Sequence, residues 1–203
     1  FTIICVARLI ERKGQHHLLQ AFAQLRASCT EPVALLFVGT GDAEPQLREL
    51  AERLKVTDAV TFKGFVPREE MPKMYHGADL FVLPSQHEGM SIALLEAMAS
   101  GLPVVVTDTG GTAELVTQGE NGEIVPWADV PALTASLQRL SNDSRRRTQM
   151  GQEGRNRAQQ FGWAALATRY LDLCEGLMAS SVEGLGRHAA VRSVRRLTKE
   201  PRV

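Results

Sequence analysis

The chain has 203 residues, 44% of them hydrophobic, which is enough to bury a substantial core in one domain, or in one domain with a tail. Its 23 basic and 23 acidic side chains balance, so overall charge gives no reason to expect a nucleic acid or an acidic partner. No apolar run approaches the roughly 20 residues of a membrane-spanning helix, and three widely spaced cysteines exclude a disulfide scaffold and favour a cytoplasmic location with reduced thiols.

Short β-rich apolar runs alternate with longer segments of helical period along most of the chain. This alternation predicts an α/β fold, a Rossmann-like, doubly wound parallel sheet of about six strands followed by C-terminal helices. The chain starts inside the first run and without a methionine, so we expect a fragment that lacks its N-terminal portion. The expected strands are 2–7, 33–38, 60–64, 80–83, 104–107 and 122–125, and the helical segments between them are 15–27, 43–55, 68–78, 90–100 and 112–119.

After Pro126 the strand pattern stops and the sequence predicts two or three helices. From residue 180 the apolar period fades while arginines accumulate, so we divide the chain into a domain at 1–178 and a basic, disordered tail at 179–203. Two interpretations of the tail remain open. It is either disorder without function or a contact with anionic lipid at the inner membrane face.

Ligands of an open, doubly wound sheet bind at the carboxyl ends of its strands. Arg8 and Lys13 follow the first expected strand, so two long cations can converge there on an anion such as a diphosphate. Solvated loop cations are the alternative. Gly39 and Gly41 follow the second strand, but the third glycine of a dinucleotide fingerprint is absent, and a structural turn explains them as well as a ligand loop does.

Two glutamates flank the start of the apolar helix expected near Ser91. Glu96 lies inside that helix, where an unpaired buried charge costs several kcal/mol, so it needs a partner. Glu88 precedes the helix beside Gly89. Both can hold hydroxyl groups around an anion site. An internal ion pair with an arginine remains open for Glu96, and a solvated loop acid for Glu88.

Five segments together resemble the C-terminal half of the group-one retaining glycosyltransferases, whose GT-B fold has two Rossmann-like domains facing each other across a cleft. The likeness covers roughly residues 1 to 175, and the two glutamates separated by seven residues are its most specific part. The segments are "VARLIERKG" at 6–14, "FVGTGD" at 37–42, "FKGFVPREEMPKMYHGADLFVLPS" at 62–85, "EGMSIALLEAMASGLPVVVTDTGG" at 88–111 and "ENGEIV" at 120–125.

The resemblance implies a role for each matching residue. Arg8 and Lys13 would hold the diphosphate of a nucleotide sugar, UDP- or GDP-linked, without a metal ion or other cofactor. Glu96 would accept hydrogen bonds from the ribose and Glu88 from the donor sugar. The remaining positions are Gly89, Met90 and Ser91, with backbone N–H groups for sugar and phosphate, and Phe65 and Val66, whose backbone would border the base.

By this resemblance, the chain would be the donor-binding half of an enzyme that transfers a sugar to a glycan or lipid-linked acceptor. The reaction would retain the anomeric configuration and serve cell-surface polysaccharide biosynthesis. The acceptor domain would lie in the missing N-terminal portion, so the fragment alone should bind nucleotide weakly and transfer nothing. Two alternatives are a sugar-nucleotide epimerase of the same architecture, against which the pair Glu88 and Glu96 argues, and a non-catalytic nucleotide-binding module.

Overall fold

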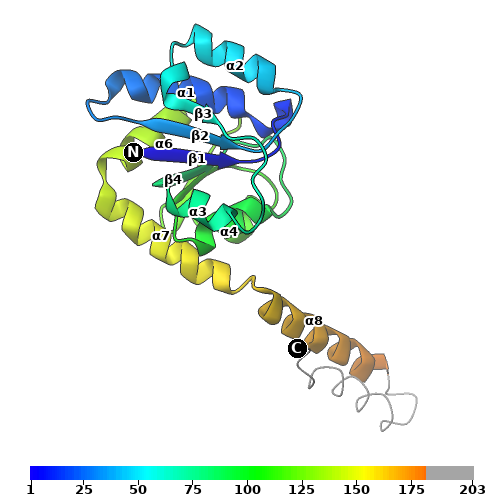
Figure 1. Ribbon diagram of the computed structural model, residues 1–203. Helices are drawn as coiled ribbons and strands as arrows, with labels where there is room; N and C mark the ends of the chain where they lie inside the picture. Colours follow the sequence, from blue (N-terminus) through cyan, green and yellow to red (C-terminus); the bar gives the residue numbers. More distant parts are fainter. Residues whose placement is uncertain (182–203) are drawn as a thin grey trace. The chain divides into compact units, whose positions relative to one another are not determined.

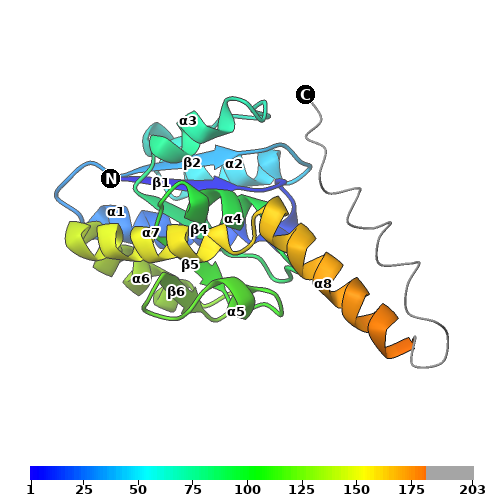
Figure 2. The same cartoon turned by 90° about the horizontal axis from the view of Figure 1, so that it is seen from below.

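A computed structural model of the chain describes residues 1–181 and contains a sheet of six strands in the order β3-β2-β1-β4-β5-β6. Figure 1 labels β1 to β4, and Figure 2 labels β5 and β6. Neighbouring strands are parallel throughout this sheet, which confirms the predicted Rossmann-like α/β class. The strands are β1 (Thr2–Val6), β2 (Ala34–Val38), β3 (Val60–Phe62), β4 (Leu80–Leu83), β5 (Val104–Thr107) and β6 (Gly122–Val125).

Helices cover both faces of the sheet (Figures 1 and 2). Helix α1 packs against α2 and α6, whereas α7 packs against α4. In Figure 1, α1 and α2 lie on one side of the sheet and α3, α4 and α7 on the other. The helices are η1 (Glu11–Lys13), α1 (Gln15–Ser28), α2 (Glu44–Arg53), η2 (Thr57–Ala59), α3 (Met71–His76), α4 (Ile92–Ala99), α5 (Thr112–Leu115), α6 (Val130–Asn142), α7 (Ser144–Gln159) and α8 (Trp163–Ser181).

The central strands are apolar on both faces. Every residue of β4 and β5 is buried, as expected where helices sandwich a parallel sheet. Ile3 and Cys5 of β1 belong to one buried cluster with Phe22 of α1 and Leu137 of α6. Burial of each large aliphatic or aromatic side chain contributes about 1.5–3 kcal/mol, so this cluster fixes the sheet from which the loops at its carboxyl edge project.

Several elements end one to four residues earlier than the sequence indicated, and the physical reason is clear for two of them. The third strand stops at Phe62 rather than residue 64, because Gly64 adopts a φ of 74° that turns the chain out of the sheet. The helix expected at 112–119 stops at Leu115, where Val116 takes an extended conformation. The side chain of Asn121 then accepts a hydrogen bond from the Thr117 N–H at 2.8 Å, which satisfies a backbone donor that the helix no longer uses.

The chain divides into two compact units, Phe1–Gln159 and Gln160–Val203. The sheet and seven α-helices, α1 to α7, lie in the first unit, and the described part of the second carries α8. The first unit thus ends before residue 178, where the sequence placed a domain boundary. Most of the expected tail at 179–203 lies outside the described residues. No helix within residues 1–181 is long and apolar enough to cross a membrane.

Candidate functional site

The winding of the sheet reverses between β1 and β4. Chain segments pass from β1 outward through β2 to β3, and then return to β4 on the other side of β1. The loops that leave the carboxyl ends of β1 and β4 therefore diverge, and a crevice at this point is where ligands bind in open α/β sheets. Arg8 and Lys13 lie on the first of these loops, and Glu88 lies on the second.

The structure joins these two loops through a largely buried ion pair. Lys13 Nζ donates to Glu88 Oε1, and the two side chains are only 14% and 15% exposed. The same carboxylate oxygen accepts a hydrogen bond from the Ser85 hydroxyl at 2.7 Å, and Ser85 is fully buried. The interpretations of Lys13 as a solvated cation and Glu88 as a solvated acid are therefore wrong.

A buried thiol lies under the electrostatic influence of this pair. Burial raises the pKa of Cys5 to about 12, Lys13 opposes the rise, and Glu88 adds to it. The thiol of Cys5 is therefore protonated at neutral pH. It packs as a small apolar side chain in the core rather than acting as a nucleophile.

Close backbone packing sets the distance between the two loops. Gly14 has a φ of 70°, and a Cβ at this position would lie 2.0 Å from the carbonyl oxygen of Pro84. The Gln86 N–H donates to the Arg12 carbonyl at 2.8 Å, which ties the loops directly. Gln15, which is buried, donates from Nε2 to the Arg8 carbonyl at 2.9 Å. These contacts hold the loop of Lys13 against the loop of Glu88 at the crevice.

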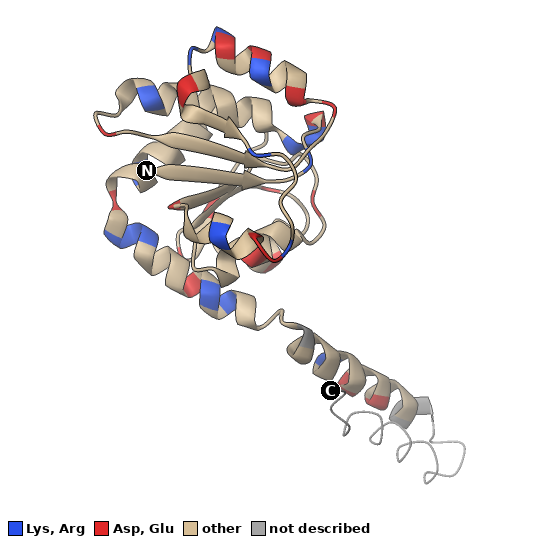
Figure 3. Cartoon of the chain, viewed as in Figure 1, with Lys and Arg blue, Asp and Glu red and all other residues tan. Residues whose placement is uncertain are grey.

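Arg8 behaves differently from Lys13. Its side chain is exposed, and among residues 1–181 its guanidinium forms no ion pair with a carboxylate. The strands beside it are uncharged: β1, β2, β4 and β5 contain no lysine, arginine, aspartate or glutamate. Within residues 1–181, the charged residues other than Glu123 of β6 lie on helices and loops (Figure 3). Arg8 therefore offers an unneutralised cation at the carboxyl edge of the sheet.

Glu96 lies in the middle of α4, and its partner is a tyrosine. The Tyr75 hydroxyl, from α3, donates to Glu96 Oε2 at 2.9 Å. No ion pair joins Glu96 to an arginine within the described part of the chain, so the arginine alternative is wrong there. Glu96 is only partly buried, whereas Tyr75 is 1% exposed.

The glycines after β2 have a clear structural use. A Cβ on Gly39 would lie 2.1 Å from the Ala7 carbonyl oxygen, and one on Gly41 would lie 2.2 Å from that of Leu9. The loops after β1 and β2 therefore lie directly against each other. The Gly39 N–H also donates to the Gly64 carbonyl at 2.8 Å, which links the loop after β3. In that loop Phe65 is 79% exposed, whereas Val66 is buried.

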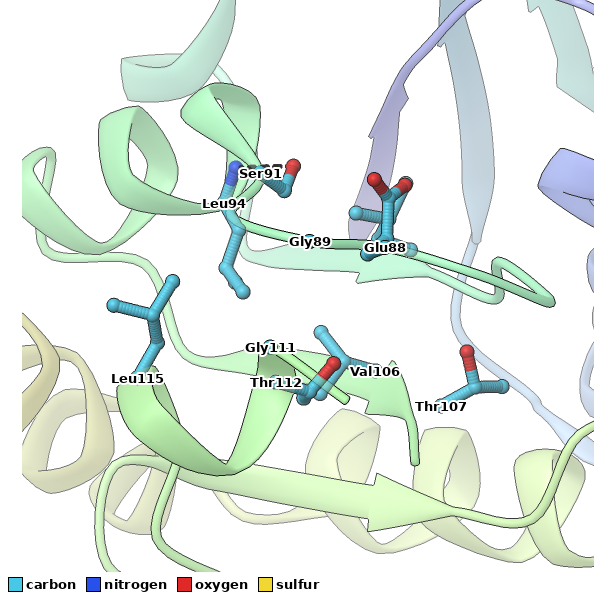
Figure 4. Close-up of a pocket in the computed structure, with 10 residues that line it drawn as sticks. Glu88, Gly89, Ser91, Leu94, Val106, Thr107, Gly111, Thr112 and Leu115 are labelled. Atoms are coloured by element: carbon cyan, nitrogen blue, oxygen red, sulfur yellow. Dashed lines mark hydrogen bonds between the residues drawn. The ribbon is translucent and has the colours of Figure 1, made fainter. Parts of the chain in front are cut away.

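The segment before α4 closes a small cavity between the exits of β4 and β5. Ser91 caps α4, because its hydroxyl accepts from the Leu94 N–H at 3.3 Å, and both Gly89 and Met90 are exposed. In Figure 4, Leu94 and Leu115 point toward each other, whereas the Glu88 carboxylate points away from them. The cavity measures about 10 Å³, room for about one water molecule, so a larger ligand would lie outside it.

Three side chains of this site were not predicted as functional: Ser85, Tyr75 and Gln15. Ser85 carried a local signal, since it follows a strand and lies three residues before Glu88. Tyr75 carried none, because its contact with Glu96 spans 21 residues and two helices. The contact between these two helices is tertiary, so the periodicity of hydrophobic residues along the sequence does not predict it.

Comparison with known proteins assigns the whole sheet to one family. Residues 1–157 match the family described as glycosyl transferases group 1. A GDP-mannose-dependent alpha-(1-6)-phosphatidylinositol monomannoside mannosyltransferase of Mycolicibacterium smegmatis is 36% identical over 183 residues, which are 86% of this chain and 48% of that protein. The amylovoran biosynthesis glycosyltransferase AmsK of Erwinia amylovora is 39% identical over 147 residues, 68% of this chain and 35% of that protein.

A solved structure agrees with this assignment. Anabaena Alr3699/HepE in complex with UDP superposes with a TM-score of 0.77 at 28% identity, covering 88% of this chain and 49% of that one. The chain thus spans about half the length, or less, of each of these three proteins.

Proposed function

The chain belongs to the group 1 glycosyl transferases, and from this we propose that it forms the donor-binding half of an enzyme that moves a sugar from a nucleoside diphosphate sugar to an acceptor. The observation that carries the proposal is the Lys13–Glu88 pair at the switch point between β1 and β4. A cation and a carboxylate, fixed together over the crevice, match a ligand that carries both phosphates and hydroxyls.

Each residue of the site would contact one part of the donor. Arg8 is exposed and without a carboxylate partner among residues 1–181, so it would bind the diphosphate together with Lys13. Glu88 would accept hydrogen bonds from the donor sugar through Oε2, since Oε1 already accepts from Lys13 and Ser85. Glu96 would hold the ribose.

Phosphate and base would use backbone groups beside these side chains. Gly89, Met90 and Ser91 precede α4, where exposed glycine backbone and a helix N-terminus favour an anion. Phe65 and Val66 would border the base, with the exposed Phe65 ring next to it. Gly39 and Gly41 would act indirectly by holding the loops after β1 and β2 together.

The two cations suit a departing diphosphate without a metal ion, because they can stabilise the negative charge that develops on the leaving group. We propose that transfer proceeds with retention of the anomeric configuration. A UDP- or GDP-linked donor fits the named relatives, one of which is GDP-mannose-dependent and one of which binds UDP. The named relatives also suggest a glycan or lipid-linked acceptor, and the acceptor-binding domain would lie outside this chain.

Calorimetric titration of the 203-residue chain with UDP, GDP and ADP tests the donor site. We expect weak binding of at least one nucleoside diphosphate. Arg8→Ala should weaken binding of that diphosphate about tenfold, because a charge-assisted hydrogen bond is lost, while leaving binding of the parent nucleoside unchanged. Arg26→Ala, at the far end of α1, serves as the matched control and should change neither affinity.

The titrations can fail in two informative ways. If the wild-type chain binds none of the three nucleoside diphosphates, the donor-site proposal is wrong. If Arg8→Ala weakens nucleoside and diphosphate equally, Arg8 does not contact phosphate. Sugar transfer by the isolated 203 residues would contradict the expectation that the acceptor site lies elsewhere.

A further inference from the structure

The partner of Glu96 gives the proposed ribose site a further component. Tyr75 lies in the short helix α3, and its ring is buried 6.4 Å from the ring of Phe81 in β4, centroid to centroid. Its hydroxyl reaches across to α4, where it donates to Glu96 Oε2 at 2.9 Å and lies 3.5 Å from the Ala93 carbonyl. The phenol is thus clamped between the sheet and the helix that carries Glu96.

The chemistry of this contact leaves half of the carboxylate available. A carboxylate has two oxygens and accepts about four hydrogen bonds, whereas a phenol donates one. Within residues 1–181, Tyr75 is the single hydrogen-bond donor to the Glu96 side chain, and it uses Oε2. Oε1 therefore keeps its full accepting capacity for a ligand. Burial, and next the hydrogen bond to Glu96, raise the pKa of Tyr75, so the phenol remains a donor at every physiological pH.

The contact also fixes the orientation of a flexible side chain. A glutamate has three rotatable bonds, and holding one rotamer costs conformational entropy that a ligand would otherwise have to supply. Because packing in the core holds the tyrosine ring, its hydroxyl has a fixed position, and the hydrogen bond fixes the Glu96 carboxylate relative to it. The positions of α3 and α4 on the sheet thereby determine where the carboxylate points.

We propose that Tyr75 is a positioning residue for donor recognition, which holds Glu96 through Oε2 so that Oε1 accepts hydrogen bonds from the ribose hydroxyls of the bound nucleotide. This rests on the proposed function, because it needs a nucleotide at the carboxyl edge of the sheet. Tyr75 does not touch the ligand. It acts through Glu96.

The test is the preference for ribose in the variant Tyr75→Phe, which removes only the hydroxyl. Affinities for UDP and for its 2′,3′-dideoxy analogue are measured on the same samples, with the GDP pair in their place if GDP binds more tightly. The ratio of two affinities cancels any loss of folded protein. We expect the wild type to prefer UDP and Tyr75→Phe to lose about threefold to tenfold of that preference, the range of one hydrogen bond.

The chain offers a matched control, since Tyr170 is its other tyrosine and is exposed in α8. Tyr170→Phe should leave the preference unchanged. In a double-mutant cycle, Tyr75→Phe should have no further effect on the preference once Glu96→Gln is present, because both changes act on the same hydrogen bonds. A merely structural tyrosine would lower the thermal midpoint without altering the ratio.

The outcomes separate this inference from the function on which it rests. If the wild type prefers ribose and Tyr75→Phe keeps the full preference, the positioning role is wrong while the donor site stands. A wild type that binds nucleotide without preferring ribose contradicts the roles of both Glu96 and Tyr75. A wild type that binds no nucleoside diphosphate overturns the proposed function and this inference together.

Discussion

Two ion pairs at opposite edges of the sheet differ in how they are built. At the carboxyl edge, Lys13 and Glu88 pair with side chains 14% and 15% exposed. At the amino edge, Arg26 at the end of α1 and Asp58 just before β3 form two hydrogen bonds of 2.6 Å, with side chains 34% and 69% exposed. The exposed pair has the better-matched, bidentate geometry, whereas the enclosed one joins a single ammonium to one carboxylate oxygen.

The difference lies in what holds each pair. The side chains of Arg26 and Asp58 face solvent, so solvent and salt screen their attraction and the pair contributes little to stability. The loops of Lys13 and Glu88 are locked by the contact of Gly14 with Pro84 and by the hydrogen bond from Gln86 to Arg12. An arrangement fixed by the backbone and kept from water is suited to a ligand site, because its charges are already in place when a ligand arrives.

The largest effect should follow from removing that backbone approach. Gly14→Ala forces a side chain into a left-handed conformation and puts its Cβ against the Pro84 carbonyl. The strain and overpacking should cost about 2–4 kcal/mol of unfolding free energy, which corresponds to a fall of about 5–15 °C in the thermal midpoint. Differential scanning calorimetry measures the shift.

The matched control is Gly110→Ala, where a Cβ would meet no atom within 4 Å. It should leave the midpoint almost unchanged. If Gly14→Ala were equally harmless, the loops could separate freely, and the contrast between a locked and an unlocked ion pair would not hold.

A smaller loss of unfolding free energy should follow when one partner of the Lys13–Glu88 pair is replaced. Lys13→Met leaves the Glu88 carboxylate poorly solvated without its cation, at a cost of about 1–3 kcal/mol by chemical denaturation. The double variant Lys13→Met with Glu88→Gln should recover part of this loss, since the unpaired charge is gone. A single variant as stable as the wild type would mean that water reaches Glu88 and that the pair is not enclosed.

Sequence periodicity was enough to predict the sheet and its order of elements. Strands β4, β5 and β6 have the expected bounds, because runs such as "LFVL" and "VVVT" are apolar on both faces and end at turn residues. Position at a strand exit also singled out Lys13 and Glu88. The burial of these two side chains could not be predicted. From the sequence an exposed loop was as plausible as a buried ion pair, because the burial depends on Gly14 and Ser85, which pack across two loops.

Partners that come from distant segments could not be predicted. Glu96 needed a partner on energetic grounds, and besides the hydroxyls of a ligand the sequence left an ion pair with an arginine open. The structure supplies a neutral phenol from α3 instead, which satisfies one oxygen without neutralising the charge. The choice between these partners depends on how α3 and α4 pack on the sheet, and helical periodicity carries no information on that.

The smallest change in stability should follow from a substitution in the exposed Arg26–Asp58 pair. This change should depend on pH. The hydrogen bond from Arg26 lowers the pKa of Asp58, so its stabilising contribution is present above about pH 4 and is lost as the pH falls through the folded-state value. Asp58→Asn should therefore lower the thermal midpoint slightly at pH 7, less than Lys13→Met does, and the difference from wild type should shrink on acidification. High salt should shrink it as well, because both side chains face solvent. A difference at pH 7 that matched that of Lys13→Met, or that resisted both acid and salt, would show that solvent does not screen the amino-edge pair, and the two pairs would then be energetically alike.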